Sequence, residues 1–129
     1  MSDLTTILYV EDDPDIQAVV QMALEVVGGF TVMLASSGES GLAAAADNQP
    51  DLILLDVMMP TMDGPATLSA LKADPALAHI PVIFVTAKVQ SSEVEHYKSL
   101  GAVDVIAKPF DPMTLSDNVR AIWSRAVTT

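Results

Sequence analysis

Three acidic side chains stand directly after short apolar runs of the sequence, where they could work together. Glu11 and Asp12 follow the run 7–10, and Asp56 follows the run 52–55. Carboxylates a few ångströms apart repel one another, and a bound cation removes that repulsion. Oxygen ligands alone, in an incomplete cage open to water, favour Mg²⁺ over softer metals. The first hypothesis for these residues is therefore a magnesium site.

A hydroxyl group and an amine follow two further apolar runs and could complete such a site. Thr86 follows the run 82–85, and the small Ala87 comes next. Lys108 follows the run 103–107. Three carboxylates carry −3 and one lysine adds +1, which leaves −2, the charge that one divalent cation would neutralise. Mg²⁺, an ammonium group and a hydroxyl group together suit the oxygens of a phosphoryl group during its transfer.

Asp56 is the best candidate for the residue that receives the phosphoryl group. A carboxylate beside a bound cation can act as a nucleophile and form an aspartyl phosphate. Asp56 ends the run that we expect to form the central strand, between the acidic pair and Lys108. Pro60 and Gly64 outline a long loop after it, and we expect this loop to leave Asp56 exposed at the edge of the sheet.

Short apolar runs alternate with helical patterns along the whole chain. Near-continuous hydrophobic runs are typical of parallel strands that are covered on both faces. Five predicted strands cover residues 7–10, 30–34, 52–55, 82–85 and 103–107. Five strand–helix units with right-handed crossovers predict a doubly wound α/β fold, a five-stranded parallel sheet of order 2-1-3-4-5 with five helices. We expect a single domain over residues 1–129, with the candidate residues meeting at the carboxyl ends of the strands.

Boundary signals place the helices between these strands. Asp13 before Pro14, and Asp111 before Pro112, each put a capping residue before a proline that suits the first helical turn. Serine and glutamate at capping-box spacing predict two further helix starts. These pairs are Ser36 with Glu39 and Ser92 with Glu95. Helices are expected to end at glycines, which are Gly28, Gly29 and Gly101.

The composition narrows the functions that remain. The chain has 17 acidic and 6 basic residues and a formal net charge of −11. Such a surface repels phosphate backbones, so we expect no direct nucleic acid binding. No apolar run approaches the roughly 18 residues of a membrane span, so we expect no membrane insertion. The absence of cysteine excludes a disulfide framework and, with no secretory signal at the N-terminus, predicts a cytoplasmic protein.

Four segments together resemble the receiver domain of two-component response regulators. They are Ile7-Leu8-Tyr9-Val10-Glu11-Asp12-Asp13, Asp56-Val57-Met58-Met59-Pro60-Thr61-Met62-Asp63-Gly64, the pair Thr86-Ala87 and the triplet Lys108-Pro109-Phe110. The resemblance extends over essentially the whole chain, in the order and spacing of the family. Each segment alone is a weak signal, whereas the combination is very specific.

The resemblance implies a phosphorylation site with a bound Mg²⁺. Asp56 would accept the phosphoryl group from a phosphohistidine of a sensor histidine kinase or of a histidine phosphotransfer protein. Asp12 would bind Mg²⁺ directly and Glu11 mainly through water, with Asp56 and the main-chain carbonyl of Met58 as further ligands. The protein would be a signalling domain and not an enzyme, because it would promote only its own phosphorylation and dephosphorylation.

Further positions gain roles from the same resemblance. Thr86 would hydrogen-bond an oxygen of the attached phosphoryl group, helped by the amide of Ala87. Lys108 would pair with the phosphoryl group, and its peptide bond to Pro109 would be cis. Gly64 fits the turn that closes the phosphorylation loop.

One position departs from the pattern of the family. Three residues before the lysine the family usually carries an aromatic ring that turns inward when the threonine hydroxyl moves, and here that residue is Val105. Signalling would instead rely on shifts around Thr86 and the helix expected over residues 92–100. We expect output through contact with a protein target, and the last two strand–helix units are the candidate interface for a homodimer.

Three alternatives remain open at this point. An aspartyl-nucleophile phosphatase of the haloacid dehalogenase type would also use Mg²⁺, but it expects a second aspartate where this chain has Met58. A flavodoxin-like FMN or nucleotide binder would need a phosphate loop rich in glycine, whereas the segment Glu11-Asp12-Asp13 would repel phosphate. A non-phosphorylated scaffold of the same fold would bind its partner equally well after the substitution Asp56→Asn.

Overall fold

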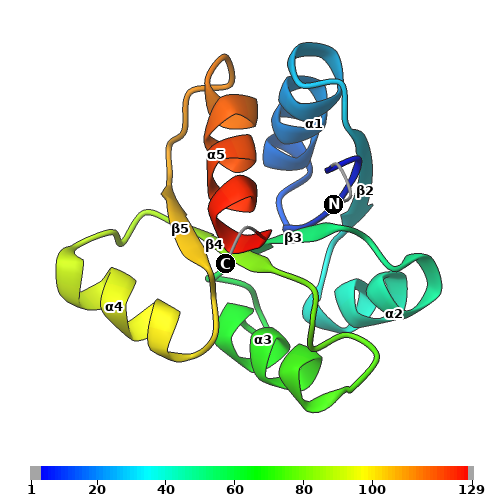
Figure 1. Ribbon diagram of the computed structural model, residues 1–129, viewed down its shortest axis with the longest axis vertical. Coiled ribbons are helices and arrows are strands. Elements are labelled where there is room, and N and C mark those ends of the chain that lie inside the picture. Colours follow the sequence, from blue (N-terminus) through cyan, green and yellow to red (C-terminus); the bar gives the residue numbers. More distant parts are fainter. Residues whose placement is uncertain (1–3, 128–129) are drawn as a thin grey trace.

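Five parallel strands form one sheet in the order β2-β1-β3-β4-β5, and β3 lies at its centre (Figure 1). The computed structural model describes residues 4–127. The strands are β1 (Thr6–Val10), β2 (Thr31–Ala35), β3 (Leu52–Asp56), β4 (Val82–Thr86) and β5 (Asp104–Ala107). The helices are α1 (Pro14–Met22), continued by the π-helical turn η1 (Ala23–Val27), then α2 (Gly38–Asn48), α3 (Gly64–Ala73), α4 (Ser91–Ser99) and α5 (Leu115–Val127). The predicted doubly wound α/β fold and its strand order are confirmed.

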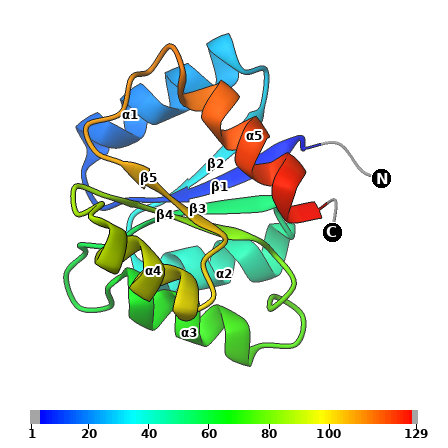
Figure 2. The same cartoon turned by 60° about the vertical axis from the view of Figure 1, so that its left-hand side comes forward.

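Helices cover both faces of the sheet (Figure 2). α1 and α5 lie on one face, and α2, α3 and α4 lie on the other. Each face has its own apolar cluster, which includes Tyr9 and Leu24 on the first face and Leu55 and Phe84 on the second. Burying one large apolar side chain contributes about 1.5–3 kcal/mol. Because both faces are covered, the strands are apolar at successive positions rather than at alternate ones.

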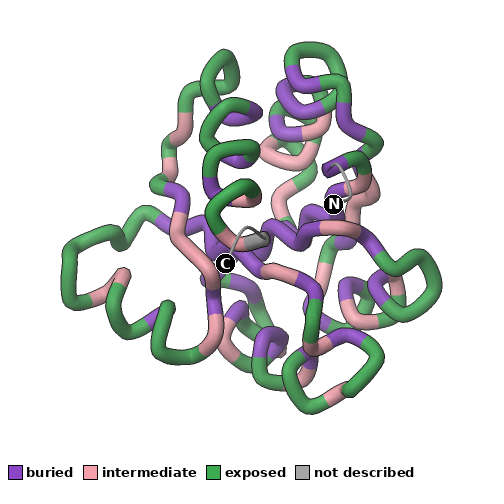
Figure 3. The backbone as a smooth tube through the Cα atoms, viewed as in Figure 1, coloured by how far each residue is buried: buried purple, intermediate pink, exposed green. Residues whose placement is uncertain are grey.

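Burial decreases from the centre of the sheet towards its edges (Figure 3). Every residue of β3 and β4 is buried, whereas the edge strands β2 and β5 include the exposed residues Thr31 and Ala107. The observed strands differ from the predicted ones by one residue at their ends. Asp56 and Thr86 are themselves the last residues of the two fully buried strands. Two polar side chains therefore stand at the end of the most deeply buried part of the sheet.

Asp13 caps α1 as predicted. Its carboxylate accepts a hydrogen bond of 2.9 Å from the backbone N–H of Asp15, and Pro14 lies in the first turn. The end of this helix departs from regular α-helix, because residues 23–27 form the π-helical turn η1. Gly28 follows this turn, where the predicted helix end places it.

The predicted start of α2 is wrong by one residue. Ser37 is the cap rather than Ser36, and its hydroxyl oxygen accepts a hydrogen bond of 3.1 Å from the backbone N–H of Ser40. The hydroxyl oxygen of Ser40 accepts one of 3.0 Å from the backbone N–H of Ser37 in return. Ser40 thus takes the part that the prediction assigned to Glu39. Two adjacent serines offer the same side-chain chemistry, and only the extended backbone at Ser37 selects between them.

The predicted start of α4 is wrong by two residues. Gln90 precedes the first helical residue, where the pair Ser92 and Glu95 predicts a later start. The carboxylate of Glu93 accepts a hydrogen bond of 3.2 Å from the backbone N–H of Gln90. Serine is in general preferred over glutamine as a capping residue. Here the residue with extended backbone before the helix is Gln90, so the helix begins directly after it.

The start of α5 differs in a similar way. The carboxylate of Asp111 accepts a hydrogen bond of 2.9 Å from the backbone N–H of Met113, as expected of a capping residue. Residues 112–114 nevertheless form a turn, and the regular helix begins at Leu115. Gly101 follows α4 with a φ of 118°, a conformation that suits glycine at the end of a helix. Within residues 4–127 we find no helix with the length and apolar character that a membrane span needs.

Candidate functional site

The carboxylates of Glu11, Asp12 and Asp56 lie together at the carboxyl edge of the sheet. β1 and β3 are neighbours, and their register places Val10 opposite Leu55. The next residues, Glu11 and Asp56, therefore lie side by side at the end of the two strands. One oxygen of each carboxylate lies within 4.8 Å of the other two. Glu11 and Asp56 are buried, whereas Asp12 is exposed. The structure thus brings the three predicted acids to one place.

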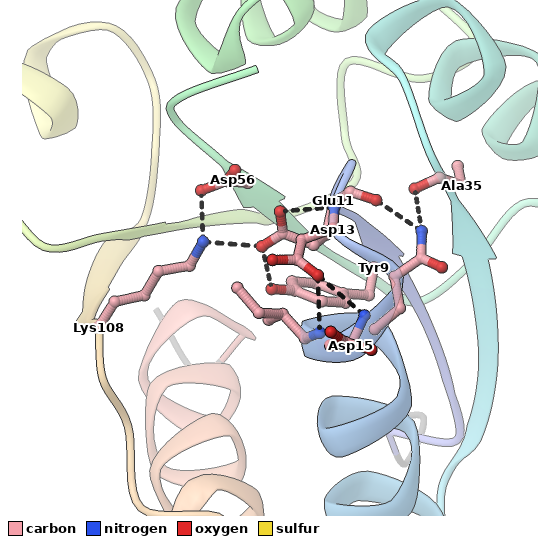
Figure 4. Close-up of polar contacts among 9 residues, drawn as sticks. Tyr9, Glu11, Asp13, Asp15, Ala35, Asp56 and Lys108 are labelled. Carbon is pink, nitrogen blue, oxygen red and sulfur yellow. Dashed lines mark hydrogen bonds and ion pairs between the residues drawn. The ribbon is translucent and has the colours of Figure 1, made fainter. Parts of the chain in front are cut away.

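Lys108 reaches both buried carboxylates from the segment after β5 (Figure 4). Its Nζ lies 2.7 Å from Oε1 of Glu11 and 2.9 Å from Oδ1 of Asp56. Its backbone N–H donates a hydrogen bond of 2.9 Å to the carbonyl of Thr86, which ties this segment to the end of β4. The peptide bond between Lys108 and Pro109 is cis, as predicted. One ammonium group therefore bridges two like charges.

Asp56 is buried, and the prediction that it would be exposed is wrong. Only 3% of the residue is accessible, because β3 is the central strand and Lys108 and Glu11 contact it from the side. Burial raises the pKa of Asp56 to about 6, and the nearby Glu11 carboxylate acts in the same direction, while Lys108 acts in the opposite one. Asp56 is therefore mostly ionised at pH 7 but is a stronger base than an ordinary aspartate.

Glu11 keeps its negative charge despite its burial. Burial alone would raise the pKa of Glu11, but hydrogen bonds from Lys108, from the Tyr9 hydroxyl and from the backbone N–H of Asp13 outweigh it and lower this pKa. The Tyr9 hydroxyl donates to Oε1 at 2.9 Å, and the Asp13 N–H donates to Oε2 at 3.2 Å. Burial and the Glu11 carboxylate raise the pKa of Tyr9 far above its ordinary value, so this hydroxyl stays protonated.

Tyr9 is a site residue that the sequence analysis did not predict. Its side chain is fully buried, and it belongs to the apolar cluster between the sheet and α1. Residues two apart on a strand point to the same face, so the spacing of Tyr9 and Glu11 was the available signal. An apolar run that contains one tyrosine does not by itself show which acceptor its hydroxyl finds.

Lys108 stays charged in this setting. Burial alone would lower the pKa of Lys108, but its hydrogen bonds to Glu11 and Asp56 raise that pKa above its ordinary value. Three carboxylates and one ammonium group leave the site with a charge of −2. Carboxylate oxygens close together with this remaining charge fit a hard divalent cation such as Mg²⁺.

Thr86 is held in place by its backbone and by a hydrogen bond to its side chain. It is buried at the end of β4, where Val85 pairs with Asp56 across the sheet. Its hydroxyl oxygen accepts a hydrogen bond of 3.1 Å from the backbone N–H of Lys88. The proton of the hydroxyl group is thus available to another acceptor. The adjacent Ala87 is exposed and brings no side chain that would block access to Thr86.

The loop after Asp56 packs closely on its backbone. Gly64 is the first residue of α3, and its N–H donates a hydrogen bond of 3.0 Å to the carbonyl of Val57. A Cβ added at Gly64 would lie only 2.7 Å from the carbonyl oxygen of Asp56. Gly64 is therefore required for close packing, and the residue with a positive φ in this loop is Thr61, at 67°. Met58 lies in the same loop, two residues after Asp56, and 68% of its surface is exposed.

Val105 lies on β5 opposite Phe84 of β4. It is half-buried and packs against the apolar cluster on the α4 side of the sheet. Phe84 in turn packs edge-on against Tyr97 of α4, with ring centroids 5.2 Å apart. β4 and α4 are therefore linked by an aromatic contact that does not involve position 105.

A groove opens beside the site between α1 and the segment after β5. It has a volume of about 410 Å³, and apolar side chains make up most of its wall. The apolar lining residues are Ile16, Val19, Ala87, Pro109 and Phe110, and Asp15 and Lys108 complete the lining. Lys108 is thus shared between the groove and the carboxylate cluster.

Comparison with known sequences identifies the family. A family model described as the response regulator receiver domain matches residues 7–120. The transcriptional regulatory protein CseB of Streptomyces avermitilis is 38% identical over 125 residues, which cover 97% of this chain and 52% of that protein. The DNA-binding dual master transcriptional regulator RpaA of Synechocystis is 40% identical over 119 residues, or 92% and 49% of the two chains. The chain spans about half the length of these curated relatives.

Solved structures show the same similarity. The chemotaxis response regulator CheY4 of Vibrio cholerae superposes with a TM-score of 0.86 at 28% identity and covers 93% of this chain and 99% of its own. The N-terminal domain of a response regulator receiver protein from Methanoculleus marisnigri superposes with a TM-score of 0.76 at 42% identity, with coverages of 92% and 96%. With its sheet order, its acidic cluster and the matched residues 7–120, the chain belongs to the response regulator receiver domain family.

Proposed function

We propose that this protein is a cytoplasmic response regulator receiver that accepts a phosphoryl group on Asp56 from a phosphohistidine of a sensor histidine kinase or of a histidine phosphotransfer protein. The receiver domain would occupy residues 1–129. The observation that carries the proposal is the position of Asp56. Its carboxylate lies beside Glu11 and Asp12 and accepts a hydrogen bond of 2.9 Å from the Lys108 ammonium group.

The proposed transfer uses the ionised form of Asp56 as nucleophile. A carboxylate oxygen forms a bond to phosphorus while the bond between phosphorus and the imidazole nitrogen of the donor breaks. The imidazole nitrogen keeps the electron pair of the broken bond, and the product on this chain is an aspartyl phosphate. A pKa of about 6 leaves Asp56 mostly ionised at pH 7, so the nucleophile is present without a separate general base.

Glu11, Asp12 and Asp56, with the main-chain carbonyl of Met58, would hold a Mg²⁺ ion. When bound, Mg²⁺ supplies positive charge that stabilises the oxygens of the phosphoryl group during transfer. Lys108 can supply further positive charge, because its ammonium group already reaches Asp56. Thr86 can donate its hydroxyl proton to an oxygen of the attached phosphoryl group, since its oxygen already accepts from Lys88.

Phosphorylation would change the surface through charge. The attached group adds about −1 of net charge at the site and brings new acceptor oxygens. Lys108 and Thr86 would turn towards these oxygens, and both are joined to the last strands by backbone hydrogen bonds. The resulting shift would bias the surface formed by the last two strand–helix units, which would contact a protein target or a second copy of the chain. With valine at position 105, the contact between Phe84 and Tyr97 is the available aromatic link to α4.

The groove beside Lys108 supports a protein as the phosphodonor. A phosphohistidine must approach Asp56 from the exposed edge of the sheet, and the apolar groove borders this site through Lys108. An apolar surface next to a strongly acidic site offers contact area to a helical donor protein. A small phosphodonor does not need this surface, so the two kinds of donor can be distinguished by experiment.

The site gives no support to the phosphatase alternative. A phosphatase of that type needs an acid two residues after its nucleophile, to protonate the leaving group. Met58 occupies that position, and a thioether cannot transfer protons. We therefore propose a signalling role without turnover of an external substrate.

Incubation with acetyl phosphate tests the proposal. With Mg²⁺ present, the intact protein should gain the mass of one phosphoryl group, and the gain should disappear when EDTA removes Mg²⁺. The variant Asp56→Asn should gain nothing, while Asp47→Asn, which changes an exposed aspartate of α2, should behave as the wild type. Equal modification of wild type and Asp56→Asn would refute the proposal.

A further inference from the structure

Tyr9 carries the one side-chain hydroxyl that contacts the acidic cluster among the described hydrogen bonds. It lies on β1, its side chain is fully buried, and its hydroxyl donates a hydrogen bond of 2.9 Å to Oε1 of Glu11. Figure 4 shows the ring beneath the Glu11 carboxylate, with its hydroxyl pointing towards it. The ring is fixed by the apolar cluster that includes Leu24 and Leu54, so the position of the hydroxyl is fixed as well.

Glu11 uses most of its acceptor sites within the protein. A carboxylate offers about four lone-pair sites. Two hydrogen bonds reach Oε1, from Tyr9 and from Lys108, and one reaches Oε2, from the backbone N–H of Asp13. About one site then remains for a ligand. These three donors therefore decide which way that remaining site faces.

The donors differ in how firmly they are held. Lys108 has a long side chain that is 20% exposed and divides its hydrogen bonds between Glu11 and Asp56. If Lys108 turns to a phosphoryl group on Asp56, Glu11 loses this partner. The hydrogen bonds from the Tyr9 hydroxyl and from the Asp13 N–H to Glu11 remain. Of these two donors, only Tyr9 belongs to the apolar core. The orientation of Glu11 would then depend mainly on Tyr9.

We propose that Tyr9 is a positioning residue for the divalent cation, whose hydroxyl holds the Glu11 carboxylate towards Asp12 and Asp56. This inference rests on the Mg²⁺ site of the proposed function. Partners that orient a metal ligand typically change metal affinity by 10–100-fold when they are removed. Because Glu11 is expected to act through water, we expect about a tenfold effect, at the lower end of this range.

The substitution Tyr9→Phe isolates the hydroxyl, because it keeps the ring and its packing. Mg²⁺ binding is measured by isothermal titration calorimetry for the wild type, for Tyr9→Phe and for Tyr97→Phe. Tyr97 is the other tyrosine, and it is buried against Phe84 on the opposite face of the sheet. Tyr9→Phe should bind Mg²⁺ about tenfold more weakly, whereas Tyr97→Phe should bind it as the wild type does.

A double substitution separates positioning from a general loss of structure. If Tyr9 acts through Glu11, then Tyr9→Phe should weaken Mg²⁺ binding no further in a chain that already carries Glu11→Ala. If Tyr9→Phe weakens Mg²⁺ binding by the same factor in the wild type and in Glu11→Ala, the inference is overturned.

Wild-type protein labelled with ¹³C at the ζ carbon of tyrosine gives a test that needs no substitution. The chain has two tyrosines, so two signals are expected. The Tyr9 signal should move on addition of Mg²⁺, and the Tyr97 signal should stay in place. If the wild type does not bind Mg²⁺ at all, the proposed function fails. If it binds Mg²⁺ but the Tyr9 signal does not move and Tyr9→Phe binds equally well, only the role of Tyr9 is refuted.

Discussion

The ammonium group of Lys108 lies 2.9 Å from the carboxylate of Asp56, although the two residues are 52 positions apart in the chain. The same group lies 2.7 Å from Glu11, so it separates two buried like charges. This contact joins the ends of β1, β3 and β5 in one electrostatic unit. The Lys108 ammonium group therefore offsets the repulsion between these two carboxylates.

Removal of the Lys108 ammonium group should destabilise the fold. In Lys108→Ala the carboxylates of Glu11 and Asp56 face each other without compensation, and we expect a loss of roughly 2 kcal/mol in the free energy of unfolding at pH 7. Urea denaturation without Mg²⁺ measures the loss. Lys88→Ala, which removes an exposed lysine side chain, should change stability by less than about 0.5 kcal/mol. Addition of Mg²⁺ should restore part of the loss, and equal stability of the two variants would contradict this explanation.

Asp56→Asn should make the protein more stable at pH 7. The folded protein binds a proton at Asp56 more tightly than the unfolded chain does, since the pKa is about 6 in place of 3.8. Ionisation of Asp56 therefore costs stability as the pH rises through this interval. We expect the variant to gain about 1–3 kcal/mol over the wild type at pH 7 without Mg²⁺.

The same argument fixes how this difference depends on pH. As the pH falls from 6 towards 4, Asp56 becomes protonated in the folded wild type, so the advantage of the variant should shrink. Thermal unfolding at a series of pH values measures this, with Asp47→Asn as the control at an exposed site. A constant difference between pH 4 and pH 7 would show that the charge of Asp56 is not its cause.

The apolar pattern predicts most of the fold because burial controls it. β3 and β4 are buried at every position, and such strands can only be apolar throughout, apart from Asp56 and Thr86 at their ends. The same reasoning places the candidate residues at one edge of the sheet. Helix starts are less predictable, because adjacent polar residues such as Ser36 and Ser37 have equal capping chemistry. The tertiary structure then decides which of them has an extended backbone.

The burial of Asp56 and the hydrogen bond from Tyr9 could not be predicted. The depth of Asp56 depends on the central place of β3 and on the side chain of Lys108, which comes from a distant part of the chain. Glycine is needed at position 64 because the loop packs closely on the backbone of Asp56, and not because Gly64 has an unusual φ. The hydrogen bond from Tyr9 to Glu11 involves a residue that the pattern counts only as apolar.

Gly64→Ala should destabilise the protein although alanine favours helix. The added Cβ would meet the carbonyl oxygen of Asp56 at 2.7 Å and the Cα of Val57 at 2.8 Å, so the backbone of the site must move. We expect a loss of about 1–3 kcal/mol in the free energy of unfolding and slower modification by acetyl phosphate. Ser69→Ala, at an exposed position of α3, is the matched control. Wild-type stability of Gly64→Ala would show that the loop accommodates the methyl group.

Val19→Lys should impair transfer from a protein donor without affecting a small one. Val19 is 45% exposed on α1 and lines the apolar groove beside Lys108, so a lysine there would place a charge on the proposed docking surface. We expect at least about a tenfold loss in the rate of transfer from a phosphorylated histidine phosphotransfer protein. The rate with acetyl phosphate should stay within about twofold of the wild type, since that substitution leaves the carboxylate cluster intact.

A matched substitution controls for the added charge. Val26 is 78% exposed on η1 and lies outside the residues that line the groove, so Val26→Lys should leave both rates unchanged. Equal effects of Val19→Lys and Val26→Lys on the protein donor would show that net charge, rather than the groove, controls the transfer.

The identity of the phosphoryl acceptor is the central claim, and reduction with sodium borohydride tests it most directly. Borohydride converts an aspartyl phosphate to homoserine, which peptide mass spectrometry locates in the sequence. After incubation with acetyl phosphate and Mg²⁺, we predict homoserine at position 56 and unchanged carboxylates at Glu11, Asp12 and Asp13. A reduced residue at any of those three positions, or none at position 56 in protein that has gained the mass of a phosphoryl group, would contradict this account.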